Sequence, residues 1–246
     1  MKESYLLRCG DCTEKLKEIN ENSIDLVLTD PPYNLGLFMK KRETNLGALR
    51  SNHFAASDWD HMDQCDWEKK LDVFFSESAR VIKTKGALII FVAIIKAETV
   101  INIAQKHGFY YKTTGIWHKT NPMPRNMNLH FINSTESWIY FINNGKTGAF
   151  NNNGKAIHDF YESGGIGMGE KKDGKHPTQK PISLMEHFVK LLSNEGDTVL
   201  DPFMGGGSSG IAAVKNNRKF YGIELNKEYF KMSDLRIKKA SKDKTP

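Results

Sequence analysis

The sequence of 246 residues is poor in cysteine and has no long apolar run. Three cysteines, a low and odd count, argue against the disulfide framework of small secreted domains. No apolar segment approaches the roughly 18 residues of a membrane span. The first five residues also lack the charged-then-apolar pattern of a signal peptide. These absences predict a cytoplasmic protein with no membrane partner.

Metal and redox chemistry have little support in the cysteine spacing. Cys9 and Cys12 have the C-x-x-C spacing of a redox pair or of half a zinc site. A zinc site needs further ligands at suitable spacing, and the third cysteine, Cys65, has no neighbour of its kind. Chance spacing is therefore favoured over a redox or metal site, and no metal is expected.

Positive charge is only mildly in excess. Lys and Arg number 35 and Asp and Glu 29, which gives a net charge of +6 and a pI near 9.0. That balance is compatible with a polyanionic partner such as nucleic acid but does not require one. The length suits one domain, residues 1–246, with inserted segments.

The apolar pattern alternates between strands and helices. Strands are predicted at residues 4–8, 24–29, 87–93, 110–118, 137–143, 198–200 and 219–223. Helices are predicted at residues 66–82, 96–106 and 182–192, and after Gly207 and Asn226. This alternation indicates an α/β fold with a mostly parallel sheet covered on both faces.

Three segments fall outside this pattern. Residues 35–63 carry Lys40, Lys41, Arg42 and Arg50 and show little periodicity, which predicts a long inserted loop. Residues 144–175 are rich in Asn, Gly and Lys and are predicted to be irregular. The basic tail from Arg236 to Pro246 is predicted to fray.

A glycine-rich turn follows the predicted strand at residues 198–200. Gly205, Gly207 and Gly210 satisfy G-x-G-x-x-G, which lets the backbone approach a ligand closely at a helix N-terminus. The next strand ends in Glu224, whose carboxylate could accept hydrogen bonds from both hydroxyls of an adenosine ribose. The alternatives are a nicotinamide dinucleotide in the same place, or a tight helix entry without a ligand.

The predicted strand at residues 24–29 runs directly into Asp30-Pro31-Pro32-Tyr33. Prolines fix φ and remove amide donors, so the carbonyls here are held rigidly at the carboxyl end of the strand, where open α/β sheets bind ligands. A carboxylate, a fixed carbonyl and an aromatic ring suit a flat substrate that bears an amino group. The alternative is a strand end followed by a rigid turn, which leaves the Asp and the Tyr unexplained.

Asp30-Pro31-Pro32-Tyr33, together with Asp201-Pro202-Phe203-Met204-Gly205-Gly206-Gly207, resembles the amino-methyltransferases of DNA. Because the first motif precedes the glycines, the resemblance is to their β class. It implies a Rossmann-like, circularly permuted S-adenosylmethionine-dependent methyltransferase fold with a mostly parallel seven-stranded sheet. The strand at 198–201 would lie at the centre, with 219–224 and then 4–11 on one side and 24–30 on the other.

The resemblance also implies functional residues. The catalytic residues would be Asp30, Pro31, Pro32 and Tyr33. The residues that bind S-adenosylmethionine would be Asp11, Cys12, Asp30, His176, Thr178, Lys180, Asp201, Phe203, Gly205, Gly207, Ser208, Ser209 and Glu224. The residues around the target base would be Trp117, Lys119, Asn121 and Arg125, with residues 126–174 as the target-recognition region. A core position is the alternative for Trp117, and surface solvation the alternative for Lys119 and Arg125.

The expected reaction is direct in-line transfer of a methyl group from S-adenosylmethionine to N6 of an adenine flipped out of DNA, leaving S-adenosylhomocysteine. Adenine is favoured because the family associates Asp at the first motif position with adenine and Ser with many cytosine-N4 enzymes. The alternatives are cytosine N4, RNA or a protein glutamine as methyl acceptor, an NAD-dependent oxidoreductase, and a non-catalytic DNA-binding module. The resemblance leaves open a homodimer and a cognate restriction endonuclease as further partners.

Overall fold

The computed structural model describes residues 4–35, 62–122, 131–172, 174 and 176–242. Its strands are β1 (Tyr5–Cys9), β2 (Ile24–Thr29), β3 (Ile82–Val92), β4 (Phe109–Lys119), β5 (Thr135–Asn143), β6 (Phe160–Ser163), β7 (Thr198–Asp201) and β8 (Lys219–Glu224). Its α-helices are α1 (Cys12–Lys15), α4 (Gln64–Val81), α5 (Ala97–Lys106), α6 (Ile182–Leu192), α7 (Ser208–Lys215) and α8 (Lys227–Lys242). Short 3-10 helices cover Leu16–Glu18, Ile94–Lys96 and Met168–Lys171.

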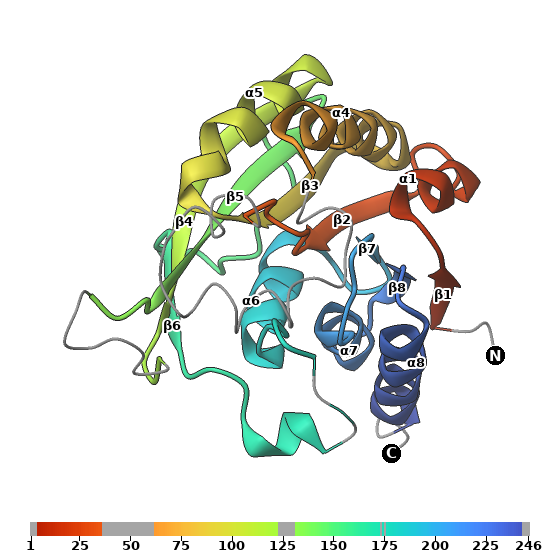
Figure 1. Ribbon diagram of the computed structural model, residues 1–246, viewed down its shortest axis with the longest axis vertical. Helices are drawn as coiled ribbons and strands as arrows, with labels where there is room; N and C mark the ends of the chain where they lie inside the picture. Colours follow the sequence, from red (N-terminus) through yellow and green to blue (C-terminus); the bar gives the residue numbers. More distant parts are fainter. Residues whose placement is uncertain (1–3, 36–61, 123–130, 173, 175, 243–246) are drawn as a thin grey trace.

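All the described strands join one sheet in the order β1-β8-β7-β2-β3-β5-β4-β6 (Figure 1). The permuted order predicted from the sequence is confirmed, with β7 between β8 and β2 and with β1 beyond β8. β5 is antiparallel to both β3 and β4, and every other described pairing is parallel. The amino end of β5 therefore lies at the same sheet edge as the carboxyl ends of its neighbours.

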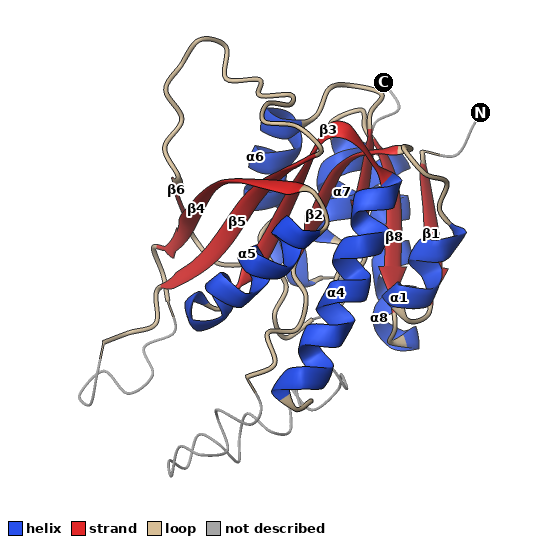
Figure 2. Cartoon of the chain, turned by 90° about the horizontal axis from the view of Figure 1, so that it is seen from above, coloured by secondary structure: helices blue, strands red, loops and turns tan. Residues whose placement is uncertain are grey.

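Helices cover both faces of the sheet. α1, α4 and α5 pack on one face and α6, α7 and α8 on the other, as the two perpendicular views show (Figures 1 and 2). Each face of the sheet has its own apolar core. The central strands are covered on both faces, so their residues are apolar on both sides of the sheet. In β2, Leu26 and Leu28 face the α6–α7 side, whereas Val27 faces α4.

Helix α4 shows how the sequence specifies one of these layers. Asp63 caps its amino end by accepting a 2.9 Å hydrogen bond from the Asp66 amide, one of the donors that a helix start leaves unsatisfied. Trp67, Leu71 and Phe74 are buried at helical spacing on the face toward the sheet. Residues 66–82 were predicted as this helix, and the structure confirms it as Gln64–Val81.

Two sequence predictions about the fold are wrong. The sheet has eight strands instead of seven, because β6 forms at Phe160–Ser163 inside the segment predicted to be irregular. The tail was predicted to fray from Arg236, but α8 continues to Lys242. Arg236 and Ile237 are buried side chains of this helix. The predicted loop at residues 35–63 lies almost wholly outside the described residues.

Within the part of the chain that the structure describes, no helix has both the length and the apolar character of a membrane span.

Candidate active site

The two sequence motifs meet where β2 and β7 end side by side. Leu26 and Val27 of β2 pair with Val199 and Leu200 of β7. Beyond this pairing, the Thr29 hydroxyl donates a 2.8 Å hydrogen bond to the carboxylate of Asp201, and both side chains are buried. Asp30 and the glycine turn are thereby fixed next to each other at the carboxyl edge of the sheet.

Asp201 organises the turn from within. Its carboxylate accepts hydrogen bonds from the Thr29 hydroxyl, the Ser209 hydroxyl and the Phe203 amide (3.0 Å). Burial raises the pKa of Asp201 to about 6, against the effect of these three donors. The Phe203 ring packs against Phe74 of α4 (5.9 Å between centroids). The three donors belong to β2, to the turn and to α7, so the Asp201 carboxylate links these three segments.

The glycines allow the turn to close. Gly205 and Gly207 have positive φ values of 47° and 75°, which side chains other than glycine rarely adopt. A Cβ on Gly207 would lie 2.9 Å from the Cβ of Ser233 in α8, so the close approach also excludes a side chain. Gly207 is the N-cap of α7, whose first turn holds Ser208 and Ser209. The turn therefore presents a helix amino end and backbone amides at the sheet edge.

Glu224 ends β8 beside this turn. Its carboxylate accepts hydrogen bonds from the amides of Gly205 (2.9 Å) and Asn226 (2.7 Å), one on each oxygen. Burial raises its pKa, and the amide donors oppose that shift. A carboxylate oxygen can accept more than one hydrogen bond, so Glu224 keeps capacity for the hydroxyls of a ligand.

The residues predicted around a cofactor from β1 and the loop before α6 also lie near this turn. The Gly10 amide donates to the Glu224 carbonyl (3.0 Å), which brings Asp11 and Cys12 alongside. Asp11 caps α1 by accepting from the Thr13 amide (2.8 Å), and burial raises the pKa of the Cys12 thiol. Cys12 is therefore a buried thiol and not a reactive thiolate.

The His176 ring packs against the glycine turn. A Cβ on Gly205 would lie 3.1 Å from the His176 ring, and the same ring contacts Tyr229 of α8 at 4.3 Å between centroids. Burial, followed by the positive charge of Lys180, lowers the pKa of His176 to about 4. The imidazole is thus neutral at physiological pH. Thr178, two residues on, is exposed.

Two polar groups beside the turn are unsatisfied. Ser208 Oγ and Gln179 Nε2 are buried and have no hydrogen-bond partner among the described residues. Both groups can donate a hydrogen bond to a polar ligand beside the turn. A backbone turn with a helix amino end, an acid at the neighbouring strand end and unpaired donors fits an adenosine-type cofactor that carries a carboxylate.

No cluster of metal-ligating side chains occurs in the described ranges.

Asp30 and Tyr33 occupy the end of β2. The Tyr33 hydroxyl donates a 2.6 Å hydrogen bond to Asp30 Oδ1, which fixes the ring relative to the carboxylate. Pro31 between them is buried and Pro32 partly buried. Two prolines hold this short segment in one backbone conformation. The sequence prediction that a carboxylate and an aromatic ring stand together here is consistent with this contact.

Lys180 ties Asp30 to a residue that the sequence analysis did not identify. The Lys180 ammonium forms ion pairs with Asp30 Oδ2 and, at 3.0 Å, with Glu136 of β5. Glu136 pairs in turn with Lys119 at the end of β4. Two lysines and two carboxylates, from β2, β4, β5 and the loop before α6, therefore form one chain of charges.

Glu136 was missed because its strand runs backwards. Residues at the amino end of a parallel strand lie at the far edge from the site, but β5 is antiparallel and brings its amino end to the site. A charged residue directly before the apolar run at 137–143 was the available signal. It becomes informative only once the direction of β5 is known.

Two of the residues predicted around the target base are in contact, with the Lys119 ammonium 5.1 Å from the centroid of the Trp117 ring. Trp117 is 3% exposed and its indole N–H donates to the Ser163 hydroxyl (2.9 Å), as a core tryptophan would. Lys119 forms an ion pair with Glu136, so its charge is not simply solvated at the surface. Asn121 accepts a 2.6 Å hydrogen bond from the Gly165 amide. Arg125 lies outside the described residues.

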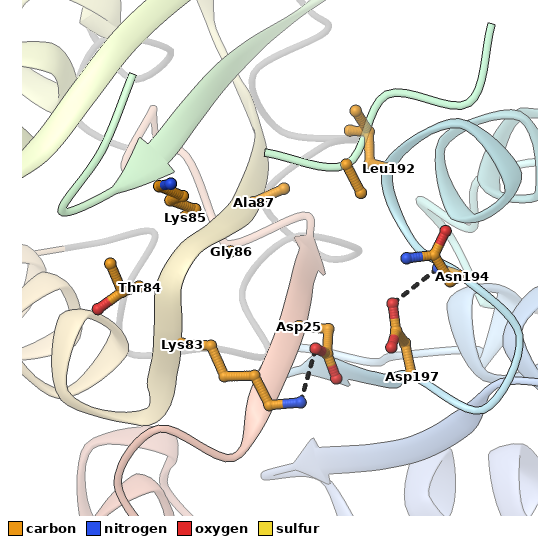
Figure 3. A pocket seen from close by; sticks show the side chains of 10 residues that line it. Asp25, Lys83, Thr84, Lys85, Gly86, Ala87, Leu192, Asn194 and Asp197 are labelled. Carbon is orange, nitrogen blue, oxygen red and sulfur yellow. Dashed lines mark hydrogen bonds and ion pairs between the residues drawn. The ribbon is translucent and has the colours of Figure 1, made fainter. Parts of the chain in front are cut away.

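A cavity of about 180 Å³ lies elsewhere, at the amino edge of the sheet (Figure 3). Two pairs of its polar groups interact: Lys83 pairs with Asp25 at 2.7 Å, and Asp197 accepts from the Asn194 amide at 2.7 Å. The second oxygen of Asp25 accepts from the Thr198 amide (2.9 Å). This cavity contains none of the predicted site residues, and its charges serve the junction of β2, β3 and β7.

The geometry has counterparts in known proteins. Residues 24–235, from β2 into α8, match the N6/N4 family model described as DNA methylase. The type II methyltransferase M2.LlaDCHI of Lactococcus lactis subsp. cremoris is 30% identical over 98% of this chain and 91% of its own length. M2.DpnII of Streptococcus pneumoniae, also named a type II methyltransferase, is 30% identical over 96% of this chain and 90% of its own.

Solved structures agree with the sequence matches. The structure of an M1.HpyAVI complex with S-adenosylmethionine superposes with a TM-score of 0.70 at 25% identity, covering 95% of this chain and 99% of that one. The cytosine-N4-specific PvuII DNA methyltransferase superposes with a TM-score of 0.74 at 19% identity, over 97% of this chain and 92% of that one. The latter similarity shows a common fold.

Proposed function

Because the chain belongs to the N6/N4 family of DNA methylases, we propose that it transfers a methyl group from S-adenosylmethionine to the N6 amino group of an adenine in DNA. DNA methylation is the activity of the family, and adenine is the finer part of the proposal. One observation supports the reaction above all: the hydrogen bond from Thr29 to Asp201 holds Asp30 beside the glycine turn. The groups for an amine and for a nucleoside cofactor are thus adjacent.

The cofactor is assigned to the turn between β7 and α7. Glu224 would accept hydrogen bonds from the ribose hydroxyls, and the amino end of α7, with Ser208, would face the carboxylate of the cofactor. Asp11 and Cys12, beside the end of β8, would meet the adenine ring. His176 is neutral above pH 5 or so and adds no second positive charge next to the cofactor. When bound, S-adenosylmethionine supplies an activated methyl group whose leaving group is its own sulfur.

The contribution of the protein to the transfer is orientation. Asp30 and the Pro31 carbonyl would each accept a hydrogen bond from one N–H of the exocyclic amine, which favours the pyramidal and more nucleophilic nitrogen. Tyr33 would stack on the base. Fixing amine and methyl group in line can supply several kcal/mol of the rate advantage. An amine inside a duplex is out of reach, so the base must first be flipped out.

Adenine is proposed over cytosine because the motif at the end of β2 begins with Asp30, as in the adenine enzymes that the sequence resembles. Physics alone separates the two bases poorly, since each amine presents two hydrogens and a carboxylate would favour a developing positive charge on either nitrogen. The structural similarity to a cytosine-N4-specific enzyme concerns the fold only. Cytosine N4 is therefore the second candidate.

The alternatives from other classes lose support. A nicotinamide oxidoreductase rested on the glycine turn and Glu224, and both lie within the residues that match the DNA methylase family. A non-catalytic DNA-binding module would have no use for the contact between Tyr33 and Asp30. We further propose a restriction–modification role, with a cognate endonuclease as partner, because relatives at 30% identity are named type II methyltransferases.

The experiment is a methylation assay with base identification. Purified protein, S-adenosylmethionine and DNA from a methylation-free host are incubated, and the DNA is digested to nucleosides and analysed by mass. The expected product is N6-methyladenine, and the Asp30→Ala variant serves as the negative control. N4-methylcytosine as the main product would overturn the choice of base and leave the family unchanged. No methylated base from a folded protein that binds S-adenosylmethionine would favour the non-catalytic module.

A further inference from the structure

The chain of charges at the end of β2 is largely shielded from solvent. Lys180 has a side chain only 5% exposed, and those of Asp30 and Glu136 are 18% and 24% exposed. The aromatic rings of Phe91 and Tyr33 lie 5.0 and 6.0 Å from the Lys180 ammonium. A buried charge is stable only when it is paired, because removing one partner leaves an uncompensated ion away from water. The ion pairs therefore hold these groups in defined positions.

The two carboxylates do not share the lysines equally. Glu136 contacts both Lys180 and Lys119, whereas among the lysines Asp30 contacts Lys180, and its other oxygen accepts from Tyr33. Burial opposes ionisation at both acids. At Glu136 the two ammonium groups outweigh burial and lower its pKa. At Asp30 burial prevails and raises the pKa, with Lys180 opposing the rise and Glu136 adding to it.

Resting on the proposed methyl transfer to an amine, we propose that Lys180 and Glu136 are positioning residues with opposite effects on Asp30. Lys180 keeps Asp30 charged and turned toward the amine. Glu136 competes with Asp30 for the Lys180 ammonium, so that the ion pair between Asp30 and Lys180 can break when the amine binds. The substrate amine must donate to the same carboxylate that Lys180 occupies. Glu136 gives the ammonium a partner to keep when the amine arrives. Lys119, at the end of β4, in turn forms an ion pair with Glu136 and holds its carboxylate in place.

This assignment differs from the cofactor role that the sequence resemblance gave to Lys180. The Lys180 ammonium has Asp30 on one side and Glu136 on the other, so its strongest interactions are within the amine end of the site. Burial tends to lower the pKa of Lys180, but the two carboxylates more than offset this and raise it. Lys180 thus stays charged over the working pH range.

Other titratable groups around Asp30 remain common to all variants. Tyr33 donates to Asp30 from the same segment. Asp201 lies on β7, where Asp30 contributes to its raised pKa, and is bound by Thr29 and Ser209. His176 is neutral above about pH 5. A changed pH dependence in Glu136→Gln therefore reports on Asp30, whereas in Lys180→Met it also includes the loss of the positive charge that lowers the pKa of His176, so that variant is judged from the Asp30 titration.

The test is the pH profile of kcat at saturating DNA and S-adenosylmethionine. In Lys180→Met the acid limb should move to higher pH by about 1–3 pH units, the usual effect of one close opposite charge. In Glu136→Gln it should move to lower pH, because Asp30 keeps Lys180 to itself and loses a like charge. Lys180→Arg should restore the wild-type limb in large part.

A control ion pair lies at the opposite end of β2. Lys83 of β3 pairs there with Asp25 of β2 (Figure 3), so Lys83→Met removes a lysine–carboxylate ion pair away from the site, although the Lys83 side chain is 46% exposed where that of Lys180 is 5% exposed. Its acid limb should coincide with that of the wild type. If Lys180→Met fails to fold, as judged by circular dichroism, the downward shift in Glu136→Gln still decides the question.

Two further outcomes keep the inference separate from the proposed function. Titration of the Asp30 carboxyl by carbon-13 NMR, assigned with Asp30→Asn, needs no turnover and should show the same order of variants. An Asp30 titration identical in wild type and both variants would overturn the inference even if the enzyme is active. Calorimetry of S-adenosylmethionine should give similar affinities for wild type and Lys180→Met, and a large loss with an unmoved acid limb would assign Lys180 to the cofactor instead. An inactive wild-type enzyme with the expected NMR shifts would refute only the proposed function.

Discussion

The hydroxyl of Thr29 reaches the carboxylate of Asp201 across 172 residues of sequence and bonds to it at 2.8 Å. Thr29 is the last residue of β2 and Asp201 the last of β7, so the bond links the ends of two neighbouring parallel strands. Asp30 follows the first residue and the glycine turn begins after the second. The pairing of β2 with β7 and this buried side-chain contact together set the relative position of the amine site and the cofactor site.

Thr29→Val tests this link, since it keeps the shape of the side chain and removes the donor. We expect the free energy of unfolding to fall by about 1.5–3 kcal/mol, the scale of a hydrogen bond to a charged group. The rate of methyl transfer should fall as well. Urea unfolding measures the first effect, with Thr113→Val on β4, whose hydroxyl makes only long contacts of 3.4–3.5 Å, as the control. Equal losses in both variants would contradict the link.

Asp30→Ala should abolish methyl transfer and leave a folded protein. The loss should be at least about 100-fold, because both orientation and charge at the amine are removed. Lys180 keeps Glu136 as a partner in this variant, so the fold should survive, as circular dichroism can verify. Asp25→Asn, at the other end of β2, is the control and should retain activity. A variant that retained a tenth or more of the wild-type rate would remove Asp30 from the reaction.

Glu224→Ala should weaken S-adenosylmethionine binding by about 1.5–3 kcal/mol. The side chain acts twice: it would bind ribose hydroxyls, and it already holds the Gly205 amide of the turn. Glu224→Gln keeps an acceptor oxygen and should lose less. Calorimetry measures both affinities, and an unchanged affinity in Glu224→Ala would place the ribose-binding acid elsewhere.

His176 should make the folded state sensitive to acid. Its pKa is lowered to about 4 in the folded protein, from an ordinary value of 6.5, chiefly by burial. The unfolded chain therefore binds a proton first, and the free energy of unfolding should decrease as the pH falls from about 6.5 to about 4. One such group contributes at most roughly 1.4 kcal/mol per pH unit.

Urea unfolding of wild type and His176→Gln between pH 4 and 7 isolates this contribution. The variant should show a shallower decline toward acid, whatever its absolute stability. Parallel curves for the two proteins would mean that His176 is protonated equally well in the folded and unfolded states.

The central strands could be predicted from the sequence because their signals are local. An apolar run that stops at Asp30-Pro31-Pro32 or at a glycine turn marks both a buried parallel strand and its functional end. The permuted strand order came from the order of these motifs along the chain together with the sheet of the family that they resemble. The strand assignments needed no knowledge of distant contacts, whereas the strand order rested on the resemblance.

The misses depended on tertiary contacts. β6 is four residues long and pairs only with β4, at the end of the sheet, so Phe160–Ser163 has too few residues to show a period. Arg236 looked like part of a solvated tail, but it bonds to the Gln179 side chain (3.0 Å) and to the Gly206 carbonyl. Glu136 joined the site only through the reversed direction of β5. In each case the partner lies far away in sequence.

During ribosomal synthesis β2 is made long before β7, one of the two strands that pair with it. Until β7 emerges, the β2 edge that will pair with it has unsatisfied backbone amides and carbonyls, which is the usual template for intermolecular pairing. Pairs so distant in sequence also form slowly, because closing a long loop costs entropy before the contact is gained. A nascent chain with β2, β3 and β5 already assembled would hold Asp30 and Glu136 but no cofactor turn. Competence to methylate DNA should therefore appear only late in folding, and the exposed edge of β2 is where aggregation of incomplete chains would begin.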